Sequence, residues 1–138
     1  MTRGFTEVTR GMKRVLWERS QQVVVAAMRV HSELGPGLLE TTYEACLAEE
    51  LRSGGHEVRA QVAVPIVYRG LELQHGYRID LLVDDEVVVE VKTVEKLAPV
   101  HEAQLLTYLR FSNRRIGLLI NFHTMHLRDG IKRMVNGW

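Results

Sequence analysis

Three charged residues lie inside apolar segments of the sequence, where a strand would place them. Asp80 interrupts an apolar run, and Glu90 and Lys92 follow the valines at 87–89. Glu90 and Lys92 are two residues apart, so on a strand both side chains leave the same face. One interpretation is an exposed ion pair that contributes about 0–1 kcal/mol. The apolar surroundings favour a second interpretation, a buried polar site.

The turn between the two segments decides whether Asp80 joins the other two. A two-residue turn at Asp84-Asp85 would make Asp80 and Glu90 point apart, whereas a three-residue turn at 84–86 sets them directly opposite each other. The longer turn also aligns the apolar residues on both faces, so we favour it. Two carboxylates opposite each other repel, and a positive group between them would relieve the repulsion.

Lys92 supplies one positive charge, and a divalent cation is the other candidate. Mg²⁺ prefers oxygen ligands and commonly takes one or two carboxylates, with water and substrate phosphate completing its shell. Asp80, Glu90 and the carbonyl of Val91 form such an open shell, to which Glu40 could add directly or through water. A cation there lowers the pKa of bound water and offsets charge on a phosphoryl group, while Lys92 could orient the attacking water.

Helical spacing adds three candidates to this site. Glu40 shares a predicted helix face with Tyr43, Leu47 and Leu51, so its carboxylate is expected at the core or a pocket, or else it is a first-turn glutamate that the helix dipole favours. Gln104 and Tyr108 are four apart and share another helix face. They could bond a phosphate or orient the ligands; a half-buried tyrosine at the core edge explains the pair equally well.

Charge is unevenly distributed, although the formal net charge is only +1. Residues 33–102 hold 14 acidic and 6 basic residues, whereas residues 110–138 hold 6 basic residues and one acid. An acidic centre beside a basic end suits a cation and a polyanion, although solvated surface charge is the simpler reading. The basic residues that we expect to contact nucleic acid are Arg110, Arg114, Arg115, Lys132 and Arg133.

Length and composition indicate a globular protein. The chain has 138 residues, of which 46% are hydrophobic and 25% charged, a mixture typical of one domain. Its single cysteine, Cys46, excludes an internal disulfide and fits a reducing compartment, so we expect a cytoplasmic protein. No apolar run reaches the roughly 20 residues of a membrane span. We divide the chain into a lead-in at 1–19, flexible or partly helical, and one domain at 20–138.

The remaining pattern predicts an α/β fold with a central mixed sheet. Helices are expected from Ser20, as the N-cap, to Leu34 and over 38–52. Alternating segments at 58–68, 71–83 and 87–93 predict an antiparallel meander. A helix over 99–112, with Val100, Ala103, Leu106 and Leu109 among its buried positions, precedes a central strand at 116–122. The order is therefore ααβββαβ, followed by a short element at 131–135 of undetermined type.

Together these segments resemble the GxxExxY proteins of the PD-(D/E)XK nuclease superfamily. The resemblance rests on a set of motifs that are weak singly and specific in this order: Gly37-Leu38-Leu39-Glu40-Thr41-Thr42-Tyr43, Gly76-Tyr77-Arg78-Ile79-Asp80, Glu90-Val91-Lys92, His101 to Tyr108, Gly117–Phe122 and Asp129–Arg133. It covers about 20–136. One departure is Ile79, where the family name has a proline.

The resemblance implies a restriction-endonuclease-like αβββαβ core, in which helices flank a central mixed sheet, and a nuclease that uses Mg²⁺ or Mn²⁺. It implies that Glu40, Asp80, Glu90 and Lys92 occupy the metal and catalytic positions, and Gln104 and Tyr108 resemble the Q-x-x-x-Y element of RecB-like exonucleases. Nucleic acid, DNA rather than RNA, is the implied partner, with a homodimer as a further reading because small nucleases of this kind often pair to grip a duplex. A non-catalytic nucleic-acid-binding or regulatory module is the alternative.

Overall fold

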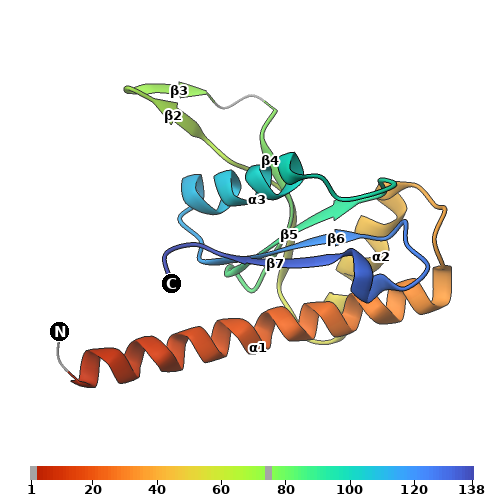
Figure 1. Cartoon of the computed structure of the whole chain (residues 1–138), viewed down its shortest axis with the longest axis horizontal. Helices are drawn as coiled ribbons and strands as arrows, with labels where there is room; N and C mark the ends of the chain where they lie inside the picture. Colours follow the sequence, from red (N-terminus) through yellow and green to blue (C-terminus); the bar gives the residue numbers. More distant parts are fainter. Residues whose placement is uncertain (1–2, 74–75) are drawn as a thin grey trace.

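A computed structural model describes residues 3–73 and 76–138 of the chain. Its main sheet has five strands in the order β1-β4-β5-β6-β7, and Figure 1 shows helices covering both faces of it. Helices α1 (Arg3–Leu34) and α2 (Glu40–Ser53) lie on one face, and α3 (Pro99–Phe111) covers the other. The strands are β1 (Val58–Ala63), β4 (Arg78–Val83), β5 (Val87–Lys92), β6 (Ile116–Asn121) and β7 (Ile131–Val135). The predicted mixed α/β fold is confirmed.

The sheet divides the core into two apolar layers. Alternate side chains of β5 explain the division, because successive residues of a strand point to opposite faces. Val87, Val89 and Val91 pack with α1 and α2, whereas Val88 packs with Leu105 of α3. Strand β6 is buried at every position, as its continuous apolar run predicts. It runs parallel to β5 and the two are joined through α3, the long crossover that parallel neighbours require.

The first helix is longer than the sequence pattern predicts. A start at Ser20 is wrong, because α1 is continuous from Arg3. Ser20 is buried within the helix and its hydroxyl donates to the carbonyl of Trp17, a bond that a mid-helix serine can make. Leu16 is already buried on the side that Val23 continues, so the apolar stripe begins before the expected cap.

Two of the predicted strands are each broken in two. The segment 58–68 becomes β1 and β2 (Ile66–Tyr68), and 71–83 becomes β3 (Leu71–Leu73) and β4. Strands β2 and β3 form a separate hairpin that projects beyond α3 in Figure 1. Pro65 has no amide hydrogen for a ladder, which accounts for the break after β1. The expected turn at Arg69-Gly70 is confirmed, with positive φ of 49° and 82° as a type I′ turn requires.

The buried face of α3 also differs from the prediction. Leu109 is buried as expected, but Val100, Ala103 and Leu106 are exposed. The helix instead turns Leu105 and Tyr108 to the sheet. Apolar residues occur on several sides of this helix, so spacing alone could not select the side that the sheet covers.

The C-terminal part adds an edge to the sheet. A short 3₁₀ helix, η1 (Leu127–Gly130), precedes β7, which pairs antiparallel with β6. The element of undetermined type at 131–135 is therefore a strand. Among the described residues, no helix combines the length and apolar character needed to cross a bilayer.

Candidate active site

Asp80 and Glu90 face each other where β4 and β5 separate. The register pairs Val83 with Val87 and Leu81 with Val89, which confirms the three-residue turn. One residue further along, at Asp80 and Glu90, hydrogen bonds accepted by the two carboxylates replace the pairing of the backbones. The amide of Asp80 donates to Glu90 Oε2 at 2.8 Å, and the amide of Val91 donates to Asp80 Oδ2 at 2.8 Å. Each acid is therefore fixed by the backbone of the other's strand.

Burial makes this pair electrostatically unfavourable when no cation is present. Glu90 is only 3% exposed, and burial together with the nearby Asp80 carboxylate raises its pKa to about 8, against the lowering effects of the Asp80 amide and Lys92. Burial also raises the pKa of Asp80, although the Val91 amide and Lys92 lower it. A positive ion beside both carboxylates would favour their charged forms.

The donor set fits a hard divalent cation with an open coordination shell. In the ranges 3–73 and 76–138, no group of three or more His, Cys, Asp and Glu side chains is arranged to hold a metal ion by itself. Mg²⁺ does not require such a cage, because it commonly retains waters and uses one or two carboxylates. The pair Asp80 and Glu90, next to the Val91 carbonyl, matches that requirement.

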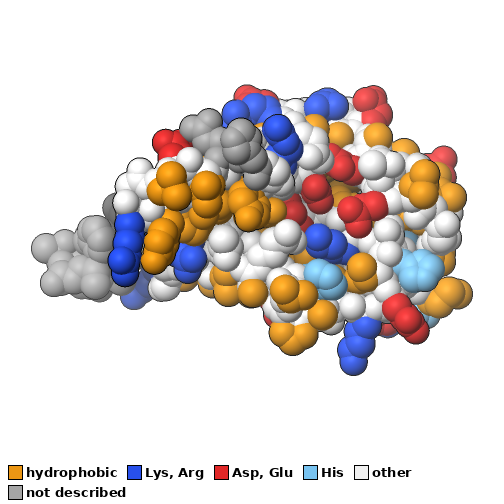
Figure 2. All heavy atoms as spheres, turned by 90° about the horizontal axis from the view of Figure 1, so that it is seen from above, with side chains coloured by type: hydrophobic (Ala, Val, Ile, Leu, Met, Phe, Trp, Pro, Cys, Tyr) orange, Lys and Arg blue, Asp and Glu red, His pale blue; other side chains and the backbone are white. Residues whose placement is uncertain are grey.

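Lys92 begins a polar chain that crosses from the sheet to α3. Its Nζ donates to Gln104 Oε1 at 3.2 Å, and Gln104 Nε2 donates to the Tyr108 hydroxyl at 3.2 Å. Burial and the nearby Glu90 carboxylate raise the pKa of Tyr108. The structure thus brings these three predicted residues together beside the acidic pair. Seen from the side of α3 in Figure 2, acidic side chains gather around a basic one on this face.

Glu40 lies at the rim of the site. It is the first residue of α2, it is exposed, and its Oε1 accepts a bond from the amide of Thr93 at 3.2 Å. The loop before it is closed by the Tyr43 hydroxyl, which donates to the carbonyl of Gly35 and accepts from the amide of Leu38. Of the two expected readings of Glu40, the structure matches the first-turn glutamate and not the side chain buried in the core, because α2 begins at this residue.

Two residues that the sequence did not single out also lie at the site. Gln61 Nε2 donates to Glu44 Oε1 at 2.7 Å and reaches Asp80 Oδ1 at 3.5 Å. Burial raises the pKa of Glu44, which the Gln61 bond opposes, and the carboxylate also lies close enough to influence Glu90. Glu44 follows Glu40 by one helical turn, a spacing that could have revealed it. Nothing in the sequence marked Gln61, which looked like an ordinary strand residue.

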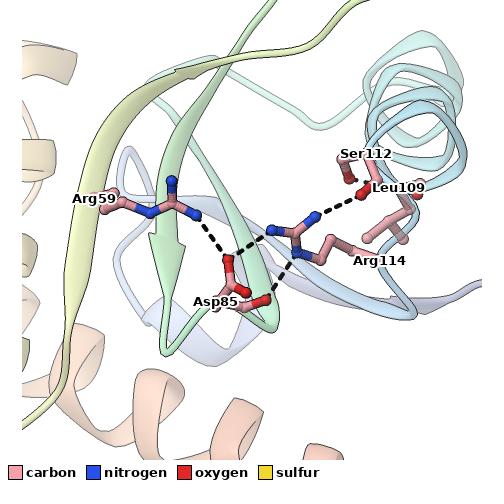
Figure 3. A network of polar contacts seen from close by, with 5 residues as sticks. All are labelled: Arg59, Asp85, Leu109, Ser112 and Arg114. Carbon is pink, nitrogen blue, oxygen red and sulfur yellow. Dashed lines mark hydrogen bonds and ion pairs between the residues drawn. The ribbon is translucent and has the colours of Figure 1, made fainter.

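The guanidinium of Arg114 makes its hydrogen bonds to other residues of the protein. Figure 3 shows its guanidinium beside Asp85: Nε donates to the Asp85 backbone carbonyl at 2.8 Å, one terminal nitrogen donates to the Asp85 carboxylate at 2.7 Å, and the other donates to the Ser112 carbonyl. Arg59 donates to the same Asp85 carboxylate from β1. Arg114 lowers the pKa of Asp85, which is the middle residue of the turn that sets the Asp80–Glu90 register.

The five basic candidates do not form one surface. Exposed Arg115 precedes β6, and Arg110 is in the last turn of α3, which leads to the same end of the sheet. Ile116, the first residue of β6, pairs with Val87, and the five residue spacings of β5 from Val87 to Lys92 span about 17 Å. Arg110 and Arg115 are therefore far from Lys92. Arg133 stacks on Trp17 of α1, 3.9 Å from its ring centroid. Lys132 instead pairs with Leu119, the neighbour of Glu90, and is near Glu102 at 4.0 Å.

Comparison with known proteins gives one match. A sequence model described as the PD-(D/E)XK nuclease superfamily matches residues 18–134, which is most of the chain. The searches of curated proteins and of solved structures gave no match. The matched range contains every residue of the acidic pair and of the lysine–glutamine–tyrosine chain.

Proposed function

Because the chain belongs to the PD-(D/E)XK nuclease superfamily, we propose that it is a metal-dependent nuclease that hydrolyses phosphodiester bonds. The supporting observation is the interlocked pair Asp80 and Glu90, held by each other's strands with Lys92 next to them. Such a pair is costly as structure alone, since burial raises the pKa of both acids. Metal binding and phosphoryl chemistry would account for two buried carboxylates lying side by side.

In this proposal Asp80, Glu90 and the Val91 carbonyl hold Mg²⁺ or Mn²⁺, and Glu40 contributes from the rim, directly or through water. When bound, the cation supplies an acidic water and offsets charge on the phosphate. Glu40 also supports assignment to the GxxExxY subfamily. The Tyr43 bonds fold the loop between Gly35 and Leu38 so that α2 begins at Glu40, beside Thr93.

Lys92 provides the fixed positive charge of the mechanism. Its ammonium group is held by Gln104, so it can orient an attacking water or stabilise negative charge on the phosphate without first reorganising. Gln104 is in turn anchored by the Tyr108 hydroxyl. We assign Gln104 and Tyr108 the role of keeping Lys92 aligned, and we propose a bound phosphate beside Lys92 as a further hydrogen-bond partner for them.

Nucleic acid is the proposed substrate, and DNA is our proposal ahead of RNA. Lys132 is the basic candidate best placed to bind the backbone near the bond that is cut, because two strand spacings, about 10 Å, separate it from Glu90. Arg110 and Arg115 would contact a longer substrate at the far end. The internal bonds of Arg114 and Arg133 leave them less able to do so. A homodimer that grips a duplex belongs to the same proposal.

The proposal can be tested by incubating the protein with labelled single- and double-stranded DNA and RNA, with and without Mg²⁺ or Mn²⁺. We expect cleavage that requires the cation and is abolished by Asp80→Asn and by Lys92→Met. Lys96→Met is the matched control, because it removes one exposed lysine just beyond the site. Metal-independent binding without cleavage by the wild type, unaffected by Glu90→Gln, would instead support a non-catalytic binding module.

A further inference from the structure

Strand β1 is kinked at one residue beside the acidic pair. Ala60 pairs with Leu81 and Val62 pairs with Ile79, so the register is the same on both sides, yet Gln61 does not pair with Asp80. Gln61 has a φ of 55°, in the left-handed region. A residue with a Cβ seldom adopts this conformation within a strand, and such outliers concentrate at functional sites.

The kink places the Gln61 amide between two carboxylates. Its Nε2 donates to Glu44 Oε1 at 2.7 Å on the α2 side and reaches Asp80 Oδ1 at 3.5 Å on the sheet side. An amide nitrogen has two hydrogens, so it can serve both acceptors at once. Meanwhile Asp80 Oδ2 is bound by the Val91 amide. The two oxygens of Asp80 therefore have different partners, which fixes the rotation of the carboxylate.

We propose that Gln61 is a positioning residue, whose left-handed backbone conformation exists to hold the Asp80 carboxylate in the orientation that binds the divalent cation. This inference rests on the proposed function. Gln61 touches no reacting atom in this scheme, because it acts on the cation only through the rotation of the Asp80 carboxylate. Gln61 is an exposed residue, and the shorter bond to Glu44 anchors its amide from the other side.

The test separates the backbone of residue 61 from its side chain. Gln61→Gly accepts a positive φ without a Cβ penalty, so the kink can persist while the amide is lost. The matched control is Asn113→Gly, which replaces another residue of positive φ, 56°, at the opposite end of the sheet. Both proteins are compared with the wild type by thermal unfolding, by calorimetric titration with Mn²⁺ and by cleavage kinetics.

We expect Gln61→Gly to unfold at the wild-type temperature or above it, yet to bind Mn²⁺ about 10-fold to 100-fold more weakly, the usual effect of removing a partner of a metal ligand. Cleavage should lose kcat while the KM for the oligonucleotide stays within about twofold, because an unaligned cation slows chemistry without weakening backbone contacts. Asn113→Gly should match the wild type in both measurements.

Wild-type Mn²⁺ affinity in Gln61→Gly would overturn the inference, as would a wild type that binds no Mn²⁺. If Gln61→Gly does not fold, Gln61→Asn takes its place, because asparagine tolerates the left-handed region and keeps an amide that is one methylene too short. It should show the same loss of affinity. A wild type that binds Mn²⁺ but cuts no nucleic acid would refute the nuclease proposal, while the calorimetric comparison would still decide the role of Gln61.

Discussion

Replacing Glu90 by glutamine should stabilise the protein at alkaline pH when divalent cations are removed. Glu90 is 3% exposed, and its pKa rises on folding from the ordinary 4.5 to about 8. Folding therefore favours the protonated acid. The stability this contributes is complete below pH 4.5 and is lost as the pH rises towards 8. Glutamine stays neutral and can still accept the amide of Asp80.

The size of the effect follows from the displacement of the pKa. One pKa unit corresponds to about 1.4 kcal/mol, so the charged Glu90 destabilises the fold by about 4–5 kcal/mol above pH 8, and by about 3 kcal/mol at pH 7. With a urea dependence of about 1–3 kcal/mol per molar, the unfolding midpoint of Glu90→Gln should exceed that of the wild type by about 1.5–5 M at pH 8.5.

The assay is urea unfolding followed by circular dichroism in EDTA at pH 5, 7 and 8.5. The gain in stability should be small at pH 5 and should grow with pH, whereas Glu49→Gln, an exposed glutamate of α2, should resemble the wild type throughout. Adding Mg²⁺ should then stabilise the wild type and not Glu90→Gln, because only the wild type keeps both carboxylates. A variant no more stable than the wild type at pH 8.5 would refute the argument that burial of this acid opposes folding.

Three further predictions concern the framework of the site. Gly117→Ala should destabilise the fold by about 1–3 kcal/mol in urea unfolding, because an added Cβ would lie 2.8 Å from the Leu105 side chain of α3; unchanged stability would show that α3 does not pack this closely on β6. Asp85→Ala should lower the melting temperature at neutral pH, because it removes the carboxylate that accepts from Arg114 and Arg59. The difference from the wild type should shrink as the pH falls below 3.8, the ordinary pKa of an aspartate, because a lowered pKa of Asp85 stabilises the fold only while its carboxylate is charged. Tyr108→Phe should reduce kcat by about 3-fold to 10-fold with little change in melting temperature, because it removes the end of the polar chain that aligns the lysine; wild-type kcat would exclude that role.

The sequence alone determined the acidic pair and the residues next to it. Asp80 opposite Glu90 depends only on strand parity and on the length of one turn, both of which are local properties of the chain. The contact of Gln104 with Tyr108 follows in the same way from the helical repeat. Alternating or continuous apolar runs likewise predicted the layered α/β fold, since each run must bury its face against a neighbour.

Only the tertiary structure decided which other side chains join or leave the site. Gln61 reaches Asp80 because a strained residue in an edge strand meets α2, a contact between segments that no spacing links. The guanidinium of Arg114 could bind phosphate, but in the fold it donates to the Asp85 carboxylate. Helix α3 buries Leu105, although its apolar pattern also allowed Leu106 to be the buried residue. In each case the outcome depends on packing between distant segments, because charge and hydrophobicity give a residue several acceptable partners and only the fold selects one.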